Sequence, residues 1–300
     1  MMNGYAHHNY AGSLEEFGTP RELSNCGGWV LERPIADTPY RDAMGCYPLF
    51  VCRDWSQLAV DLHDFRHDLV SLGLVADPFG QYDEALLRHC FDRVIPFKEH
   101  FVADLSQPIT TIVSAHHQKY TRRAFKNVSI DICEHPARFL DEWTELYGNL
   151  TEKFDVRGIR AFSRSSFEKQ LNIPGAVMLR ALHQGETVAA HLVYVNDDVC
   201  YGHLVGCSET GQKLLASYAL YWAEIEYFTG KARWFDWGAG AGLSSENNGL
   251  TQFKRGWSTG TRLTWFCGKI FNKEQYAEIV RQKGVPETAY FPAYRMGEFG

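Results

Sequence analysis

The chain has 300 residues, of which 45% are hydrophobic and 22% charged, and its formal net charge at pH 7 is −6. A chain of this length forms one large domain or two ordinary ones, and it buries enough surface to fold without disulfides or metals. The acidic balance argues against a protein coated in basic surface for nucleic acid, and it leaves room only for a local basic groove.

Cysteine usage and the N-terminal segment bear on the cellular compartment. The eight cysteines are spaced singly, with no C-x-x-C and no two pairs at zinc-ligand spacing, so we expect reduced thiols. The first residues, MMNGYAHHNYAGSLEEFG, lack the apolar stretch of a signal peptide. No apolar run approaches the roughly 20 residues of a membrane-spanning helix. We therefore predict a cytoplasmic protein without a membrane span.

The first part of the chain predicts short elements. Residues 1–28 are expected to form a loose leader. Runs of apolar residues, and alternation of apolar with polar residues, then predict strands. In residues 83–94 the apolar residues are instead spaced as on one face of a helix. The expected strands are 29–34, 47–52, one within 69–80 that ends at a turn, and 97–105.

The second part gives clearer patterns. Residues 109–127 predict a helix with a basic C-terminal end, which suits the helix dipole. Residues 176–206 predict three antiparallel strands, with hairpin turns at 184–185 and 196–198. The other expected helices are 136–154, 159–171, 212–230 and 273–283, and the other expected strands are 128–133, 233–238 and 261–268.

Nucleotide-binding and metal-binding patterns are weak in this sequence. There is no G-x-x-x-x-G-K-[ST], and no G-x-G-x-x-G follows a strand. The run GAGAG (238–242) follows a predicted strand, but no long helix clearly begins there. His63 and His67 are four residues apart, which on a helix is metal-ligand spacing. Without a distant third ligand, we interpret them as part of a solvated charged face and predict no metal.

Four sequence blocks stand out along the chain: HHQKYTRRAFKNVSIDI (116–132), LRALHQGETVAAHLVYV (179–195), YALYWAEIEYFTGKARWFDWGA (218–239) and GLTQFKRGW (249–257). These blocks and the order of the predicted elements resemble the FemABX-like acyltransferases of the GNAT superfamily. The blocks occur in the family's order. The resemblance implies an α/β fold of tandem GNAT-like domains, each a mixed, mostly antiparallel sheet flanked by helices. It places a shortened first domain at 29–115 and an acyltransferase domain at 116–300.

The same resemblance implies an N-acyltransferase that forms an amide bond. This reaction needs a neutral amine, an oriented acyl donor and stabilisation of the oxyanion of the tetrahedral intermediate. In the resembled family the lysine of the F-K motif faces the reaction centre, so Lys254 is predicted to bind the oxyanion or a donor phosphate. The alternative is a surface lysine between two packing aromatic side chains.

Three further residues are candidates for the catalytic machinery. Asp236 ends a strand and could accept the amine proton or bind the ammonium form, but it could instead cap the turn. Tyr201 and His203 are two residues apart on a strand, where the alternation predicts one face. His203 is the candidate general base because its ordinary pKa is near 6.5. The competing interpretation is a hydrogen-bonded core histidine.

Candidate substrate-binding residues are cationic or aromatic. Arginines at a helix end could hold a phosphate or carboxylate of the acceptor, or they could only compensate the helix dipole. Tryptophans near the F-K motif could stack on unpaired bases, and nearby cations could contact the acceptor end of a tRNA. These candidates are Lys119, Arg122, Arg123, Lys213, Trp237, Phe253, Arg255 and Trp257.

The identity of the donor depends on one loop. Coenzyme A-dependent GNAT proteins usually carry [QR]-x-x-G-x-[GA] before the long helix, where backbone N–H groups hold the pyrophosphate. Here CSETGQKLLAS (207–217) keeps Gly211 but neither the spacing nor the second glycine. FemABX-like aminoacyltransferases share this departure, so we favour aminoacyl-tRNA as the donor over acyl-CoA. The expected acceptor is an amine on a small peptide-like, cell-wall-like or natural-product molecule, without a further cofactor. A non-catalytic protein that binds nucleotide or tRNA is the third alternative.

Overall fold

The computed structural model describes residues 3–153, 155–240 and 249–298, and the chain divides into two compact units. Unit 1 comprises Lys98–Leu263 together with Asn3, and unit 2 comprises Gly4–Phe97 together with the chain from Thr264 onward. This division differs from the predicted boundary at residue 116. The C-terminal part belongs with the N-terminal part because strand β11 (Gly260–Ile270) pairs with β4 (Ser71–Ala76) over six residues.

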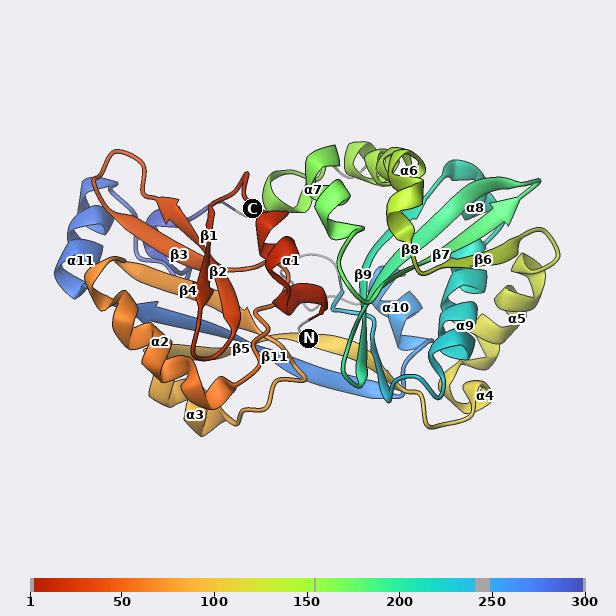
Figure 1. Ribbon diagram of the computed structural model, residues 1–300, viewed down its shortest axis with the longest axis horizontal. Coiled ribbons are helices and arrows are strands. Elements are labelled where there is room, and N and C mark those ends of the chain that lie inside the picture. The colour runs from red at the N-terminus through yellow and green to blue at the C-terminus, as the bar shows by residue number, and fades with distance from the viewer. Residues whose placement is uncertain (1–2, 154, 241–248, 299–300) are drawn as a thin grey trace. The chain divides into compact units, whose positions relative to one another are not determined.

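Unit 2 is a mixed sheet with helices packed on it (Figure 1). Its strands follow the order β1-β2-β3-β4-β11. Neighbours are antiparallel except for the parallel pair β3 and β4. Helices α2 and α3 contact each other. The remaining bounds are β1 Thr19–Leu23, β2 Gly28–Pro34, β3 Arg41–Gly45, α1 His8–Gly12, α2 Leu58–Asp64, α3 Glu84–Cys90 and α11 Lys273–Gln282.

Two predictions in unit 2 are wrong. The N-terminal residues are not a loose leader, because they contain α1 and β1, and the side chains of Tyr10 and Leu14 are fully buried. The Tyr10 hydroxyl also donates to the backbone carbonyl of Tyr47. Residues 47–52 are not a strand, since only Phe50 makes a bridge, with Ala76. Pro48 within this segment lacks an N–H for a strand ladder.

Unit 1 contains a larger mixed sheet in the order β5-β10-β9-β8-β7-β6. The three antiparallel strands predicted over 176–206 are present, and the two hairpin turns lie where they were expected. Gln184, Gly185 and Asp197 have positive φ, as such tight turns require. The predicted fold class, a mixed and mostly antiparallel architecture flanked by helices, is confirmed. The bounds are β5 Arg93–Asp104, β6 Ser129–Cys133, β7 Ala176–His183, β8 Glu186–Asn196, β9 Val199–Cys207 and β10 Trp234–Asp236.

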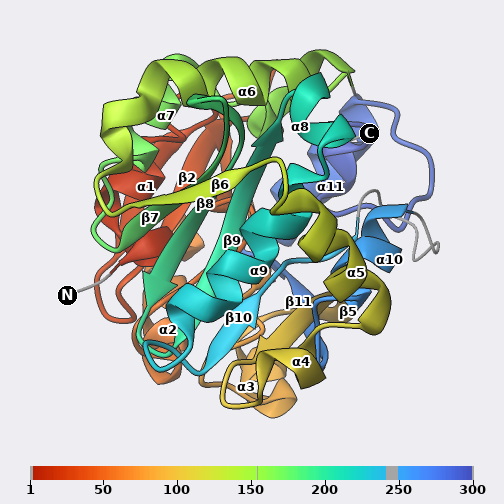
Figure 2. The same cartoon turned by 90° about the vertical axis from the view of Figure 1, so that its right-hand side faces the viewer.

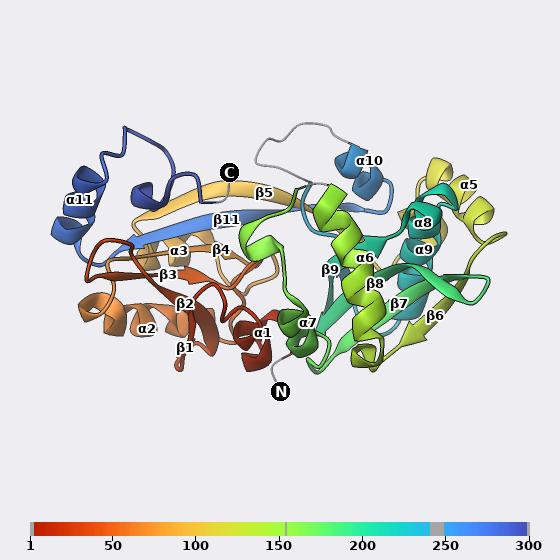
Figure 3. The ribbon, with the colours of Figure 1, turned by 90° about the horizontal axis from the view of Figure 1, so that it is seen from above.

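Helices cover both faces of the unit 1 sheet. Helix α6 crosses β8 and β9 (Figure 3), whereas α9 packs on β7 and β8 with α5 beside it (Figure 2). None of the helices in the described ranges combines the length and the apolar character that a bilayer span needs. The bounds are α4 Ile109–Ile112, α5 Ala115–Ala124, α6 Leu140–Lys153, α7 Arg164–Gln170, α8 Glu209–Lys213, α9 Ala216–Phe228 and α10 Gly249–Arg255.

Two helices that were predicted as continuous are each broken in two. The predicted helix 109–127 divides into α4 and α5 at Ser114, whose side chain caps the N–H of His117. The predicted helix 212–230 divides into α8 and α9 at Leu215, whose φ of 63° is left-handed. The second break turns the N-terminus of α9 toward the site described next.

Candidate active site

The site begins where two parallel strands separate. Strands β9 and β10 pair at only three positions, the last of which is Asp236 with Tyr201. Strand β9 continues for six more residues to Cys207, whereas the chain after Asp236 turns away at Gly238 (φ 72°). The second half of β9 therefore presents an edge to an opening in the sheet.

A β-bulge marks the same point of β9. Leu192 of β8 pairs with Leu204, but the next residue, Val193, pairs with Gly202. His203 is therefore an extra residue on β9 with no opposite partner in the register. A bulge bends its strand and breaks the alternation of side chains.

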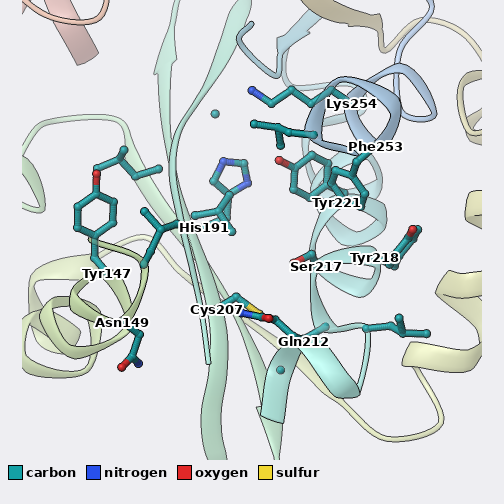
Figure 4. Close-up of a pocket in the computed structure, with 18 of the residues that line it drawn as sticks. Tyr147, Asn149, His191, Cys207, Gln212, Ser217, Tyr218, Tyr221, Phe253 and Lys254 are labelled. Carbon is teal, nitrogen blue, oxygen red and sulfur yellow. The ribbon is translucent and has the colours of Figure 1, made fainter. Parts of the chain in front are cut away.

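A cavity of about 1090 Å³ fills the opening (Figure 4). It lies within unit 1, and its walls come from the second half of β9 and from α6, α8, α9 and α10. Its size is at the upper end of the roughly 300–1,000 Å³ range of small-molecule sites, so it accommodates a large substrate or two substrates. Besides Cys207 and three tyrosines, the ionisable side chains in its wall are Lys153, His191, His203, Glu209, Lys213 and Lys254.

Lys254 lies at one end of this cavity, on the last turn of α10. Its Nζ donates a hydrogen bond of 2.7 Å to the backbone carbonyl of Ala239. Burial lowers the pKa of Lys254 to about 8, an effect that the charge of Asp236 opposes and the charge of Lys98 reinforces. Near neutral pH this ammonium group therefore gives up a proton more readily than an ordinary lysine, and it can donate a hydrogen bond to a developing oxyanion.

Comparison with known proteins agrees with this geometry. Residues 115–255 match the family model of the acetyltransferase (GNAT) domain. The chain superposes on FemX with a TM-score of 0.64 at 12% identity, covering 90% of this chain and 93% of that chain. The chain therefore has a GNAT fold that is similar to the fold of FemX.

Two further solved structures share this fold. The C-terminal domain of a putative lysylphosphatidylglycerol synthetase from Agrobacterium fabrum has a TM-score of 0.63 at 14% identity, covering 92% of both chains. The L-PGS of Bacillus licheniformis has a TM-score of 0.59 at 16% identity, covering 91% of this chain and 94% of that chain. No curated protein matches the sequence.

Asp236 lies behind the cavity wall of the GNAT domain and is not among the residues that line it. Its buried carboxylate is 2.8 Å from Nδ1 of His100 and accepts a 2.7 Å hydrogen bond from the N–H of Gly238. The structure thus shows Asp236 capping the turn and holding His100. It affects the cavity through its charge on Lys254.

The structure separates the predicted pair Tyr201 and His203. His203 lines the cavity, stacks on Tyr194 at 4.9 Å, and its Nε2 lies 3.2 Å from Oε1 of Gln170. Burial, together with the nearby His191, lowers the pKa of His203 to about 3, so the ring is neutral and weakly basic near pH 7. Tyr201 is buried and does not line the cavity, because the bulge ends the alternation that related it to His203.

The F-K motif lies on helix α10, and only part of it faces the cavity. Phe253 and Lys254 line the cavity, Arg255 is exposed, and Trp257 is fully buried. The glycine-rich run before the motif extends into residues 241–248, which lie outside the described ranges.

The two tryptophans are placed differently from the prediction. Trp237 is 2% exposed and lies between Tyr221 (4.5 Å) and Phe235 (3.8 Å), with both contacts stacked. Its Nε1 donates to the backbone carbonyl of Trp257, which is itself fully buried. Trp237 is one of the cavity-lining residues, whereas Trp257 does not line the cavity. Neighbouring rings cover both faces of Trp237, which leaves no free ring face for the base stacking predicted from the sequence.

The predicted cationic residues lie outside the cavity or at its edge. Lys119, Arg122 and Arg123 are exposed on α5 and are not among the cavity-lining residues. Lys213 is exposed on α8, lines the cavity and forms a 2.6 Å ion pair with Glu209.

Within the described ranges, no cluster of three or more His, Cys, Asp or Glu side chains could hold a metal ion.

Residues 256–260 read G-W-S-T-G, which matches the G-x-S-x-G motif of a nucleophilic serine. That motif requires a strand before the serine and a helix after it. Here Ser258 follows helix α10, and its hydroxyl donates to the carbonyls of Lys254 and Arg255, both at 3.1 Å. Ser258 therefore closes the end of a helix and is not an activated nucleophile.

Sequence reasoning missed the pair formed by His191 on β8 and Glu224 on α9. Both side chains are buried, and Nδ1 of His191 is 2.7 Å from Oε1 of Glu224. Each is a polar residue within a mainly apolar segment, His191 in AAHLVYV and Glu224 in YWAEIEYF. A single polar residue in such a segment was the sequence pattern that could have indicated a buried polar pair.

Proposed function

We propose that the protein is an N-acyltransferase that moves an aminoacyl group from the 3′ end of an aminoacyl-tRNA to an amine on a small peptide-like or cell-wall-like acceptor. The observation that carries the proposal is the cavity at the separation of β9 and β10, with Lys254 in its wall. In this reaction the Lys254 ammonium group donates to the oxyanion as the amine attacks the acyl carbon.

The N-terminus of α9 supports an anionic donor. Leu215, the N-cap of this 13-residue helix, and Ala216 and Ser217 of its first turn all line the cavity. First-turn N–H groups lack intrahelical partners and carry the positive end of the helix dipole. They suit a phosphate group, which both an aminoacyl-tRNA and an acyl-CoA supply.

The surface of α5 favours tRNA of the two donors. Residues 115–127 contain four exposed cations and no acidic residue. The helix borders the cavity, because Tyr120 stacks on the cavity-lining Tyr218 at 5.2 Å. In addition, Nε2 of the buried His117 lies 3.0 Å from the carbonyl oxygen of Phe253. A basic helix beside the cavity suits the phosphates of an acceptor strand.

The names of the structural neighbours also bear on the donor. The Agrobacterium fabrum neighbour is named a putative lysylphosphatidylglycerol synthetase, which points to an aminoacyl group. The matching family model is described as an acetyltransferase domain, which favours acyl-CoA as the second candidate.

A turnover screen tests the proposal. Purified protein is offered charged tRNAs or acyl-CoAs with amine acceptors, and new amides are sought by mass spectrometry. We expect amides only with charged tRNA. Low-micromolar coenzyme A binding by calorimetry, with amides formed from acyl-CoA, would instead establish the second candidate.

A charge reversal on α5 tests the tRNA surface directly. The double variant Arg122→Glu/Arg123→Glu should weaken tRNA binding severalfold and flatten its salt dependence, because two phosphate contacts are lost. The matched control is Arg281→Glu/Lys283→Glu, exposed positions at the end of α11 in unit 2. Equal tRNA affinity and equal salt dependence in both double variants would exclude α5 as the tRNA surface.

A further inference from the structure

The His191–Glu224 pair lies at the cavity, with His191 in its wall and Glu224 buried behind it. His191 is 2% exposed, Glu224 is fully buried, and the ring of His191 stacks on Tyr221 at 5.4 Å and 18°. His191 is nevertheless one of the cavity-lining residues, and Figure 4 shows it near Tyr221 and Lys254 at one end of the cavity. The pair therefore joins a buried carboxylate to a ring that a substrate can reach.

The hydrogen bond selects the tautomer of His191. A carboxylate accepts hydrogen bonds, so at 2.7 Å from Glu224 the Nδ1 atom carries the proton. In the neutral ring, Nε2 then keeps its lone pair. This is the state in which an imidazole accepts a proton from a reacting group.

Gly202 opens the other edge of the ring to the cavity. A Cβ at this position would lie 2.9 Å from both Cε1 and Nε2 of His191, and Gly202 is itself in the cavity wall. Glycine at this position thus keeps the space beside Nε2 of His191 free of a side chain at the point where β9 bends.

A packing role alone explains the pair poorly. The second carboxylate oxygen of Glu224, Oε2, is buried and has no hydrogen-bond partner among the residues that the structure describes. An unsatisfied buried acceptor costs roughly 1–3 kcal/mol, and buried ionisable pairs are weak contributors to stability. Two apolar residues would fill the same volume without that cost.

We propose that His191 is the general base of the acyl transfer and that Glu224 is its positioning residue. The proposal rests on the proposed function. The amine nitrogen attacks the acyl carbon and a C–N bond forms, while Nε2 of His191 takes the amine proton. The C–O bond to the tRNA ribose then breaks, and the imidazolium returns the proton to the leaving oxygen. One amine and one ester become one amide and one alcohol.

The other ionisable groups around His191 are less suited to this role. Burial raises the pKa of the Tyr221 hydroxyl well above its ordinary value, so it stays protonated. The pKa of His203, lowered to about 3, makes that ring a weak base. Lys254 is mainly protonated near pH 7 and supplies a hydrogen bond to the oxyanion, which leaves proton acceptance to His191.

Kinetics of three variants test the pair. His191→Gln should lower kcat by roughly 100-fold or more, in the range of a lost general base, and remove the acidic limb of the pH profile. Glu224→Gln should lower kcat similarly with little change in KM, because the amide no longer fixes the tautomer. Glu224→Asp, which restores the carboxylate, should recover part of the loss.

The matched control is His183→Gln. The Nδ1 of His183 also has a hydrogen-bonded partner, the carbonyl of Asn127 at 2.7 Å, but His183 is not among the cavity-lining residues. Its turnover and pH profile should be those of the wild type.

Nitrogen-15 NMR of histidine-labelled protein gives a readout that needs no substrate. In the neutral ring the His191 signals should report a protonated Nδ1 and an unprotonated Nε2, and Glu224→Gln should disturb this tautomer. Gly202→Ala should lower kcat several-fold by covering Nε2, whereas Gly260→Ala, where a Cβ meets nothing within 4 Å, should not.

The outcomes separate the two proposals. If the wild type makes no amide with any donor, the proposed function fails, and the catalytic role of His191 fails with it. If the wild type makes amides but folded His191→Gln keeps wild-type turnover and the acidic limb, only the role of His191 is overturned. An Nε2-protonated neutral ring in the wild type would overturn it as well.

Discussion

Replacing Lys254 by methionine should raise the free energy of unfolding and lower the acyl-transfer activity. Burial lowers the pKa of this lysine from 10.5 to about 8, so the folded state binds its proton less tightly than the unfolded state does. Holding that charge near pH 7 costs about 3 kcal/mol, since one pKa unit corresponds to about 1.4 kcal/mol. Methionine has a similar length and carries no charge, but it gives up the hydrogen bond to Ala239, which contributes about 1 kcal/mol. Lys254→Met should therefore be more stable than the wild type by about 2 kcal/mol near pH 7.

The sign of the pH dependence follows from the same shift. Between pH 8 and pH 10.5 the unfolded lysine keeps a proton that the folded lysine has lost, so wild-type stability rises with pH in this window. The advantage of Lys254→Met should consequently shrink by about 2 kcal/mol between about pH 7 and about pH 9.5. Subtracting the unfolding free energy of the wild type from that of Lys254→Met at each pH removes the contributions of all other titrating groups.

Urea unfolding followed by circular dichroism at several pH values measures this difference. Acyl-transfer turnover of the same variant should fall roughly a hundredfold, as for a lost oxyanion donor. Lys254→Arg should restore only part of the activity, because a planar guanidinium does not place its charge where an ammonium does. Arg255→Met is the matched control, since this exposed neighbour should change stability by less than about 0.5 kcal/mol and turnover little. A stability difference that does not vary with pH would refute the buried-cation argument, and undiminished turnover in Lys254→Met would remove Lys254 from the mechanism.

Three further predictions concern packing and charge. Gly148→Ala in α6 should raise the free energy of unfolding by roughly 0.5–1 kcal/mol in a urea titration, because a Cβ there meets nothing within 4 Å and alanine favours helix. Trp257→Ala should cost roughly 3–5 kcal/mol by the same titration, as for other buried tryptophans, yet leave the tRNA affinity of the folded protein unchanged. Hydrogen bonds from Arg233 hold the pKa of Asp104 at about 2, so Arg233→Gln should raise that pKa toward its ordinary value in a carbon-13 NMR titration. The pair's contribution should be present near pH 7 and be lost as the pH falls toward 2, and an unchanged Asp104 titration would contradict this assignment.

Local patterns in the sequence determined much of unit 1. The strands of 176–206 were predicted from apolar runs and from turn residues such as Gly185 and Asp197, which tolerate positive φ. Alternation and turn chemistry act between residues that are close in the chain, so they can be read without the fold. The lysine of the F-K motif was likewise found from a resemblance in local sequence, and the structure places it in the cavity wall.

Only the tertiary structure decided which side chains face the cavity. The sequence predicted that Trp237 and Trp257 could stack on bases, but aromatic side chains from α9, β10 and α10 cover their rings, and only Trp237 is among the cavity-lining residues. His203 and Tyr201 were predicted to share one face of β9, but a bulge interrupts the alternation of side chains there, and this bulge depends on the pairing of β9 with β8.

The His191–Glu224 pair is the clearest example of a site feature that the sequence by itself did not reveal. Its two members are 33 residues apart, on a strand and on the helix that packs against it. Neither the 2.7 Å contact nor the opening left by Gly202 is encoded in a local pattern. Both arise when α9 docks on β8 and when β9 separates from β10, and such long-range contacts exist only once the chain has folded.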